Sequence, residues 1–262
     1  MPTLGRFHTP NRAAVAPPDA GAMRSADDIE AMFGRIVRNY DTMNRLMTGG
    51  RDGAWRRIVA RQAILGRREG HVLDVATGTG DLAFALALAG AKDVTAIDFS
   101  QPMLDVAGRK LTQRQAVIGE DLPITFRHAD AMRLPFDTGQ FDAVTVAFGL
   151  RNMRDTQVAI NEMTRVLRPG GRWVCLELTP FRVPLLRAGF GIYFQRVVPV
   201  VGGMLSGDRE AYRYLPQSAQ RFLSAAELLS AMQKAGLVNT RYRLLGGGTV
   251  AMHVGEKSWP GA

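Results

Sequence analysis

The chain has 262 residues, of which 46% are hydrophobic and 22% charged, so it is long enough to fold as one large α/β domain with a substantial core. A single cysteine, Cys175, excludes an internal disulfide, and no apolar run approaches the roughly 18 residues of a membrane span. The net charge of +9 divides into +5 for residues 1–70, −2 for residues 71–180 and +6 for residues 181–262. The basic flanks fit contact with an anionic surface or substrate, and they equally fit arginines scattered over solvated helices.

The N-terminal region is expected to hold a disordered segment followed by helices. Residues 1–24 are rich in Pro and Ala without an apolar signal core, so we expect disorder there and a cytoplasmic protein. One helix begins at Ser25, with acids in its first turn, and a second runs from Trp55 to Leu65. We expect these helices, within residues 25–66, to form a lid over the carboxyl ends of the strands.

The organising stretch lies between Val72 and Ala89. An apolar run to Val75 predicts a buried parallel strand, a small-residue turn follows, and a helix begins at Asp81. This order is typical of a nucleotide-binding βαβ unit, in which glycines let the backbone approach a ligand. A dinucleotide fingerprint would need a third glycine at Asp81, and this acid would repel a pyrophosphate.

The turn and a second acid together indicate which nucleotide is bound. The pattern D-x-A-x-G-x-G, from Asp74 to Gly80, is similar to motif I of the S-adenosylmethionine-dependent methyltransferases. Asp98 ends a second strand, residues 93–98, where a carboxylate can accept hydrogen bonds from ribose hydroxyls. The alternative is a plain strand-to-helix turn with a surface aspartate.

Strands and helices continue to alternate to the end of the chain. Arg168-Pro169-Gly170-Gly171 should stop a helix, and Ser224 with Glu227 forms a capping box. The expected elements are a helix over 101–110, strands over 125–128 and 141–147, a helix ending at 167, a strand over 173–178, a helix over 224–236, and strands over 241–245 and 250–254. The sequence predicts an α/β, doubly wound, Rossmann-like sheet of about seven strands, mostly parallel, with a C-terminal antiparallel hairpin. We expect residues 25–262 to be a single domain.

Two longer motifs narrow the resemblance. Tyr40-Asp41-x-Met43-Asn44, with Gly50 and Trp55, and Arg165-Val166-Leu167-Arg168-Pro169-Gly170-Gly171, with Glu177 and Thr179, resemble the two signatures of the ubiquinone/menaquinone biosynthesis C-methyltransferases. The resemblance covers roughly residues 26–257. Where the family usually has Ser, His, Lys and Ser, this chain has Thr48, Asp52, Arg168 and Thr179. Asp52 is the one replacement that changes the chemistry, because it removes an imidazole.

The resemblance implies S-adenosylmethionine as cofactor, with contacts at Thr79, Asp98, Asp130, Ala131 and Ala147. The predicted cofactor-binding residues are Asp74, Ala76, Gly78, Thr79, Gly80, Asp98, Phe99, Asp130, Ala131 and Ala147, and no metal is predicted. Asp130 follows the third strand, where it can accept from the adenine amino group. Phe99 and Met103 can flank the adenine, although their spacing favours the core. Asp74 is expected to orient the turn rather than contact the ligand.

The family reaction would methylate a ring carbon of a prenylated quinol such as demethylmenaquinol. The ring carbon becomes nucleophilic when the neighbouring phenol, with a pKa of about 10, loses its proton. Predicted catalytic residues are Arg151, which would stabilise the quinolate, its neighbour Asn152, and Tyr212. Each has a plainer interpretation, as a solvated or capping charge or as ordinary packing. Asp41, Asp52, Tyr214 and His253 are weaker candidates, and His253 fits a core position better.

The partners follow from the same reasoning. Residues 181–223 are expected to be an insertion on the substrate side, and the apolar stretch 181–205, with three arginines, predicts a prenyl-tail groove, a membrane-surface helix or a buried core helix. A lipid-soluble quinol, peripheral contact with an anionic membrane on the inner face of the cell membrane, and a homodimer are the predicted partners. No nucleic acid is expected, because Ala147-Phe148-Gly149-Leu150 stands where a nucleic-acid amino-methylating enzyme would have a polar-Pro-Pro-aromatic motif.

Two other functions remain open. A methyltransferase for another small molecule would use the same cofactor, and a non-catalytic scaffold of a quinone-biosynthesis complex would retain it. The residues do not separate menaquinone from ubiquinone precursors.

Overall fold

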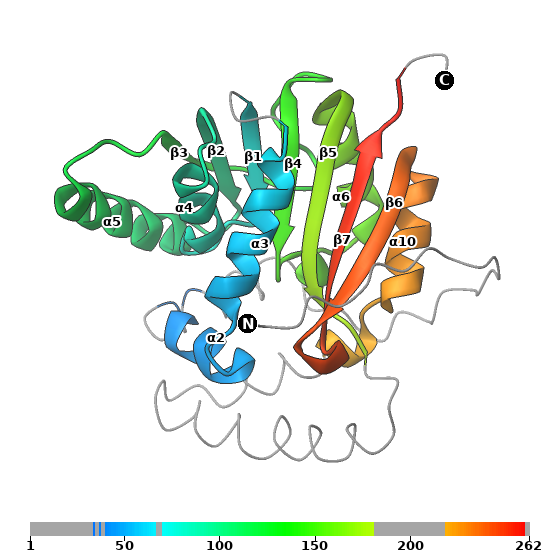
Figure 1. Ribbon diagram of the computed structural model, residues 1–262, viewed down its shortest axis with the longest axis horizontal. Coiled ribbons are helices and arrows are strands. Elements are labelled where there is room, and N and C mark those ends of the chain that lie inside the picture. Colours follow the sequence, from blue (N-terminus) through cyan, green and yellow to red (C-terminus); the bar gives the residue numbers. More distant parts are fainter. Residues whose placement is uncertain (1–33, 35–36, 38–39, 67–69, 181–217, 260–262) are drawn as a thin grey trace.

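The computed structural model describes residues 34, 37, 40–66, 70–180 and 218–259. Within this part of the chain seven strands form one sheet in the order β3-β2-β1-β4-β5-β7-β6 (Figure 1). The strands are β1 His71–Val75, β2 Asp93–Asp98, β3 Ile124–His128, β4 Phe141–Ala147, β5 Leu167–Leu178, β6 Leu237–Leu245 and β7 Val250–Lys257. The predicted 1–24 segment and most of the 181–223 insertion lie outside the described residues.

The pairing of the strands gives the sheet its mixed character. Strands β1 to β5 are parallel, with Leu73 of β1 opposite Val144 of β4, whereas β7 is antiparallel to both β5 and β6. The strand order reverses direction between β1 and β4, and ligands of doubly wound sheets bind outside the carboxyl ends of the strands at such a point. The predicted fold class is therefore confirmed, and its topology places a binding site beyond β1 and β4.

Helices cover both faces of the sheet, because each strand alternates apolar residues between them. Val72 and Val94 join one buried cluster with residues of α3 and α4, and Leu73 and Cys175 join the other with residues of α6 and α10. The helices are α2 Tyr40–Thr48, α3 Asp52–Ile64, α4 Asp81–Leu88, α5 Gln101–Ile118, α6 Thr156–Val166 and α10 Ala225–Lys234, with short 3₁₀ turns η2 Leu150–Asn152 and η4 Gly246–Gly248.

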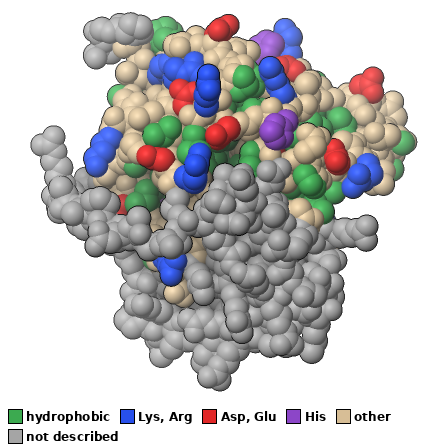
Figure 2. Space-filling view, turned by 180° about the vertical axis from the view of Figure 1, so that it is seen from behind, with side chains coloured by type: hydrophobic (Ala, Val, Ile, Leu, Met, Phe, Trp, Pro, Cys, Tyr) green, Lys and Arg blue, Asp and Glu red, His purple; other side chains and the backbone are tan. Residues whose placement is uncertain are grey.

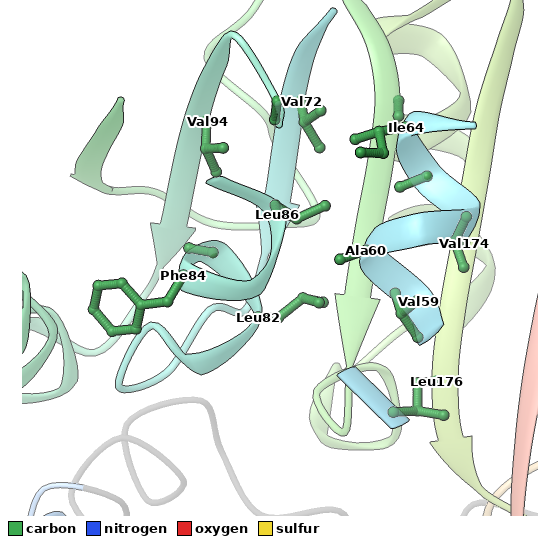
Figure 3. Packing of buried hydrophobic residues seen from close by; sticks show 14 of the residues in the cluster. Val59, Ala60, Ile64, Val72, Leu82, Phe84, Leu86, Val94, Val174 and Leu176 are labelled. Atoms are coloured by element: carbon green, nitrogen blue, oxygen red, sulfur yellow. The ribbon is translucent and has the colours of Figure 1, made fainter. Parts of the chain in front are cut away.

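Helices α2 and α3, which precede β1, lie at different places on the sheet. In Figure 1, α2 lies beyond the carboxyl ends of the strands, as a lid would, whereas α3 runs over the face of the sheet. Val59, Ala60 and Ile64 of α3 lie over β4 and β5 near Val174 (Figure 3). We expected the second helix over the strand ends, but its apolar stripe is buried against the sheet instead, because burial of that stripe stabilises the fold.

Three element boundaries also differ from the prediction. Helix α5 continues to Ile118 through polar, helix-forming residues and ends at Gly119, whose φ of +77° suits a left-handed cap. Strand β5 begins at Leu167, and its pairing with β4 shifts over the bulge that contains Gly170. Strand β6 begins at Leu237, before a second irregularity. The predicted capping box is confirmed, since Ser224 and Glu227 exchange both hydrogen bonds at the start of α10.

Candidate functional site

A cavity of about 240 Å³ opens at the carboxyl ends of β1, β2 and β4, beside the lid helix α2. Most of its lining is apolar, and the polar side chains stand at a few places. The lining residues are Tyr40, Ala76, Gly78, Ile97, Asp98, Phe99, Ser100, Met103, His128, Ala129, Asp130, Ala131, Met132, Phe148, Gly149, Asn152, Met153 and Arg154. An apolar pocket with few polar groups is the usual form of a small-molecule site.

The backbone around the cavity is strained where β1 and β4 end. Ala76, with φ +53°, and Phe148, with φ +58°, are non-glycine residues in the left-handed region. A Cβ on Gly149 would lie 2.5 Å from the Cβ of Ala76, so the two strand ends approach each other too closely for a side chain. Such strain persists only where the surrounding structure fixes it, and it concentrates at binding sites.

Asp98 lines the cavity, and backbone N–H groups hold its carboxylate in place. Its Oδ2 accepts from the backbone N–H of Gly78 at 2.8 Å, and its Oδ1 accepts from that of Ser100 at 2.9 Å. Burial raises the pKa of Asp98, while these backbone N–H groups oppose the rise. Each carboxylate oxygen keeps further acceptor capacity, which suits the two hydroxyls of a ribose. The residues present therefore fit a nucleoside without phosphates.

Asp74 supports the turn and does not line the cavity. It is fully buried and accepts from the hydroxyls of Thr77 at 2.7 Å and Thr145 at 2.8 Å. Burial raises its pKa to about 6, although both hydroxyl donors lower it. Asp74 thus joins the turn after β1 to the neighbouring strand β4.

The other predicted cofactor residues divide into two groups. Ala76, Gly78, Phe99, Asp130 and Ala131 line the cavity with Asp98, whereas Thr79, Gly80 and Ala147 do not. The hydroxyl of Thr79 donates instead to Asp41 of the lid helix at 2.6 Å. Met103 lines the cavity as Phe99 does, and it is also buried, with 2% of its surface exposed, as the expected core position requires.

Of the predicted catalytic residues that the structure describes, one lines the cavity and the other does not. Asn152, in η2, lines the cavity, but the guanidinium of Arg151 is buried and donates to Glu177 Oε1 at 2.7 Å. Tyr212 and Tyr214 lie outside the described residues. Asp52 forms a buried ion pair with Arg56 at 2.9 Å.

His253 occupies the core between β7 and α10. Its Nε2 lies 2.8 Å from the carbonyl oxygen of Ala225, and because a carbonyl only accepts, Nε2 carries the proton. Burial lowers the pKa of His253 to about 4, so the ring is neutral at physiological pH.

Sequence reasoning missed part of the cavity wall, including Tyr40 and His128. Tyr40, the first residue of α2, lines the cavity, and its ring lies 3.7 Å from the position of a Cβ on Gly78. Burial raises the pKa of Tyr40, so its phenol stays protonated. His128 ends β3 opposite Asp98, and its Nε2 lies 2.7 Å from the carbonyl oxygen of Phe99. The signal for Tyr40 was its place at the head of the first signature.

The described residues offer neither a metal-binding cluster nor a helix that could span a membrane. No group of three or more His, Cys, Asp or Glu side chains is arranged to hold a metal ion in the part of the chain that the structure describes. None of the helices in that part combines the length and the apolar character that crossing a bilayer demands.

Comparison with known proteins decides the family. The model of the ubiE/COQ5 methyltransferase family matches residues 22–257. The chain belongs to the ubiE/COQ5 methyltransferase family. This membership confirms the predicted resemblance and the predicted S-adenosylmethionine-dependent enzyme class.

Relatives of this methyltransferase are similar over almost their whole length. A demethylmenaquinone methyltransferase of Thermus thermophilus is 45% identical, over 86% of this chain and 100% of that protein. Those of Roseiflexus castenholzii, 42% identical over 94% of this chain and 99% of theirs, and of Staphylococcus aureus, 38% identical over 88% and 93%, carry the same name.

Solved structures show how widely the fold is used. The [4+2]-cyclase SpnF superposes with a TM-score of 0.63 at 18% identity, over 94% of this chain and 98% of that one. A SAM-dependent methyltransferase of Aquifex aeolicus gives a TM-score of 0.52 at 18% identity, over 74% and 88%. At such identities the likeness shows the fold alone, and the reaction must be argued from the site.

Proposed function

We propose that this methyltransferase transfers a methyl group from S-adenosylmethionine to a ring carbon of a prenylated quinol, with demethylmenaquinol as the substrate. The observation that carries the proposal is the 45% identity to the Thermus thermophilus demethylmenaquinone methyltransferase over the whole length of that protein. Supporting it, the cavity combines a carboxylate suited to a ribose with a largely apolar wall.

The cofactor end of the cavity is assigned to the residues after β1, β2 and β3. Asp98 would hold the ribose hydroxyls, Phe99 and Met103 would flank the adenine, and Asp130 would stand at the rim. The side chain of Asp130 already accepts from the N–H of Met132 at 2.8 Å, which fixes its direction. When bound, S-adenosylmethionine supplies an electrophilic methyl group on a sulfonium.

The end of the cavity that would hold the quinol, the methyl acceptor, needs electrostatic surroundings that allow a quinolate to form. Burial raises the pKa of Tyr40 at this wall of the cavity, while its hydrogen bond with Asn44 and the charges of Arg151 and Arg56 oppose the rise. A quinol has a pKa of about 10, and at this wall it would meet the same opposing effects of burial and of cationic charge. Tyr40 itself stays protonated and can donate to the quinol oxygen.

Positioning and the exclusion of water complete the proposed mechanism. Phe148, Met132 and Met153 give the cavity apolar walls, and Asn152 supplies an amide between them. The ring of Phe148 lies 5.3 Å from the guanidinium carbon of Arg56, so this buried cation also packs against the wall. A dry site that holds both reactants in line contributes much of the rate in such transfers.

The test is a transfer assay with labelled S-adenosylmethionine and separate quinol substrates. We expect label in the quinone fraction when demethylmenaquinol is supplied, and none with Asp98→Asn. The matched control is Asp93→Asn, at the exposed start of the same strand, which should transfer label normally. Label only on a ubiquinone precursor or a polar metabolite would reject the assigned substrate, and binding without any transfer would leave a scaffold.

We also propose that the enzyme meets its lipid-soluble substrate at an anionic membrane surface. The support is the charge of +5 over residues 1–70 and +6 over residues 181–262, against −2 between them. On the described part of the face in Figure 2, Lys and Arg are interspersed with Asp and Glu, so that face offers no single-sign patch. Arg182, Arg187 and Arg196 lie outside the described residues and are the proposed contacts.

Liposome co-sedimentation tests this second proposal. Replacing those three arginines with Gln should weaken binding to anionic vesicles, and replacing the exposed Arg57, Arg61 and Arg133 should not. Unchanged binding in the first variant would reject it. Homodimerisation stays a prediction, to be checked by light scattering.

A further inference from the structure

A polar cluster joins three elements that are far apart in the sequence. The ammonium Nζ of Lys110, on α5, lies 2.6 Å from Asp81 Oδ1, 2.9 Å from Asp41 Oδ2 and 3.2 Å from Thr79 Oγ1. Asp41 belongs to the lid helix α2, while Thr79 and Asp81 belong to the turn after β1 and the start of α4. One cation therefore connects the lid to the turn that carries the cofactor site.

The cluster is a closed network rather than a single surface pair. The hydroxyl of Thr79 donates to Asp41 Oδ1 at 2.6 Å, so lid and turn are also joined directly. The side chains of Lys110, Asp41 and Asp81 are only 20%, 32% and 25% exposed. Burial raises the pKa of Asp81, but the charge and hydrogen bond of Lys110, together with the charges of Arg56 and Arg114, outweigh it, and the pKa is lowered. The carboxylate of Asp81 is thus charged at neutral pH, and the ammonium of Lys110 lies within ion-pair distance of both Asp81 and Asp41.

The position of the cluster links it to the cavity wall. Asp41 directly follows Tyr40, whose ring lies against Gly78 and forms part of that wall. Fixing Asp41 fixes the first turn of α2, and with it the direction of Tyr40. The cluster also explains why Thr79 does not line the cavity, since its hydroxyl is engaged by the lid.

We propose that Lys110 is a positioning residue, a clasp that holds the lid helix against the cofactor turn through Asp41, Thr79 and Asp81. Removing the ammonium leaves two carboxylates facing each other without a counter-charge, so attraction between lid and turn becomes repulsion. By linkage, a lid that is held closed strengthens cofactor binding, and bound cofactor in turn favours the closed lid. Thr79 accordingly serves the lid rather than the cofactor.

The experiment is calorimetric titration of the full chain with S-adenosylhomocysteine, which needs no quinol. We expect Lys110→Met to weaken binding about tenfold, with rescue by Lys110→Arg, because a guanidinium can still bridge the acids. The matched control is Lys92→Met, at an exposed site, which should bind normally. Thermal unfolding of each variant identifies any that fails to fold.

A double-variant cycle separates the clasp from a merely structural role. Asp41→Asn alone should weaken binding, but Asp41→Asn combined with Lys110→Met should bind better than Lys110→Met, because the repulsion has gone. Adding Thr79→Val to Lys110→Met should weaken binding further, because it also removes the direct hydrogen bond from Thr79 to Asp41. Normal binding by Lys110→Met, or additive losses in the cycle, would each overturn the proposal. None of these outcomes depends on the identity of the methyl acceptor.

Discussion

The carboxyl ends of β1, β2 and β4 differ from the β5–β7–β6 half of the sheet in how they accommodate strain. At the first, Ala76 and Phe148 adopt positive φ although their side chains disfavour it. In the second, the corresponding position is Asn239, in the bulge of β6, a residue type that tolerates the left-handed region. Backbone strain from a positive φ is thus present beside the cavity, where glycine or asparagine would relieve it. In the antiparallel half the residue with a positive φ is one that tolerates it.

The two regions also bury polar groups differently. Asp98 keeps acceptor capacity facing a cavity, and Asp74 is held by two hydroxyls beneath it. In the antiparallel half, His253 is buried as a neutral ring beside the carbonyl oxygen of Ala225. Arg172 forms an ion pair with Glu256. Asp98 therefore faces the cavity, whereas Asp74, His253 and Arg172 join elements of the fold.

The largest expected effect comes from closing the gap between the two strand ends. Gly149→Ala would place a Cβ 2.5 Å from that of Ala76 and displace the turn, and we expect cofactor affinity to fall about a hundredfold. Ala76→Gly combined with Gly149→Ala should recover most of the affinity, since the clash disappears. Gly108→Ala, in α5 with open space around it, is the control that should bind normally. Failure of the double variant to recover would mean that the close approach is not the cause.

The next largest effect is expected on the free energy of unfolding, and two Arg–Glu ion pairs should differ in it. The side chains of Arg151 and Glu177 are 4% and 1% exposed, while those of Arg172 and Glu256 are 11% and 24% exposed. We expect Arg151→Met to lower the free energy of unfolding by about 3–5 kcal/mol, because it leaves a buried carboxylate unpaired. Arg172→Met should cost about 1–2 kcal/mol, since water can reach its partner. Urea unfolding measures both, and equal losses would contradict the distinction.

The two regions should respond to pH with opposite signs. The pKa of Asp74 is about 6 in the fold against 3.8 unfolded, so the native state binds more protons in that window and stability falls as pH rises through it. The pKa of His253 is about 4 against 6.5, so the unfolded state binds more protons and stability is lost as pH falls from about 6.5 to 4. Each effect is on the order of 3 kcal/mol.

Unfolding free energies at several pH values between 4 and 7 check this. The advantage of the parent over Asp74→Asn should shrink as pH rises, and its advantage over His253→Gln should grow. Differences from the parent are needed because Asp98, whose pKa burial also raises, contributes its own slope. Parallel curves for the two variants would contradict the assignment of opposite signs.

The smallest effect lies in the antiparallel half. Ser224→Ala removes one side of the capping box of α10, and we expect a loss of about 1 kcal/mol in unfolding free energy with unchanged cofactor affinity. Ser230→Ala, on the exposed face of the same helix, should change stability by only a few tenths of a kcal/mol at most. Weaker cofactor binding in Ser224→Ala would show that the two regions are coupled.

The sequence by itself determined most of the fold and the centre of the site. The apolar run from Val72 to Val75, the small-residue turn and Asp98 at the end of the next strand are local patterns, and a parallel sheet converts them into neighbours at one edge. The capping box could also be predicted from a local pattern, because Ser224 and Glu227 are only three residues apart. The two family signatures added a prediction of the substrate class.

Only the tertiary structure decided which side chains meet. Arg151 pairs with Glu177 because β4 and β5 are neighbours, and Thr79 faces Asp41 because α2 lies beyond the strand ends while α3 covers the sheet. The extension of α5 beyond Lys110 to Ile118 was likewise not predicted from the sequence. Local propensity and spacing act over a few residues, whereas these contacts depend on strand register and on which apolar surfaces are buried together.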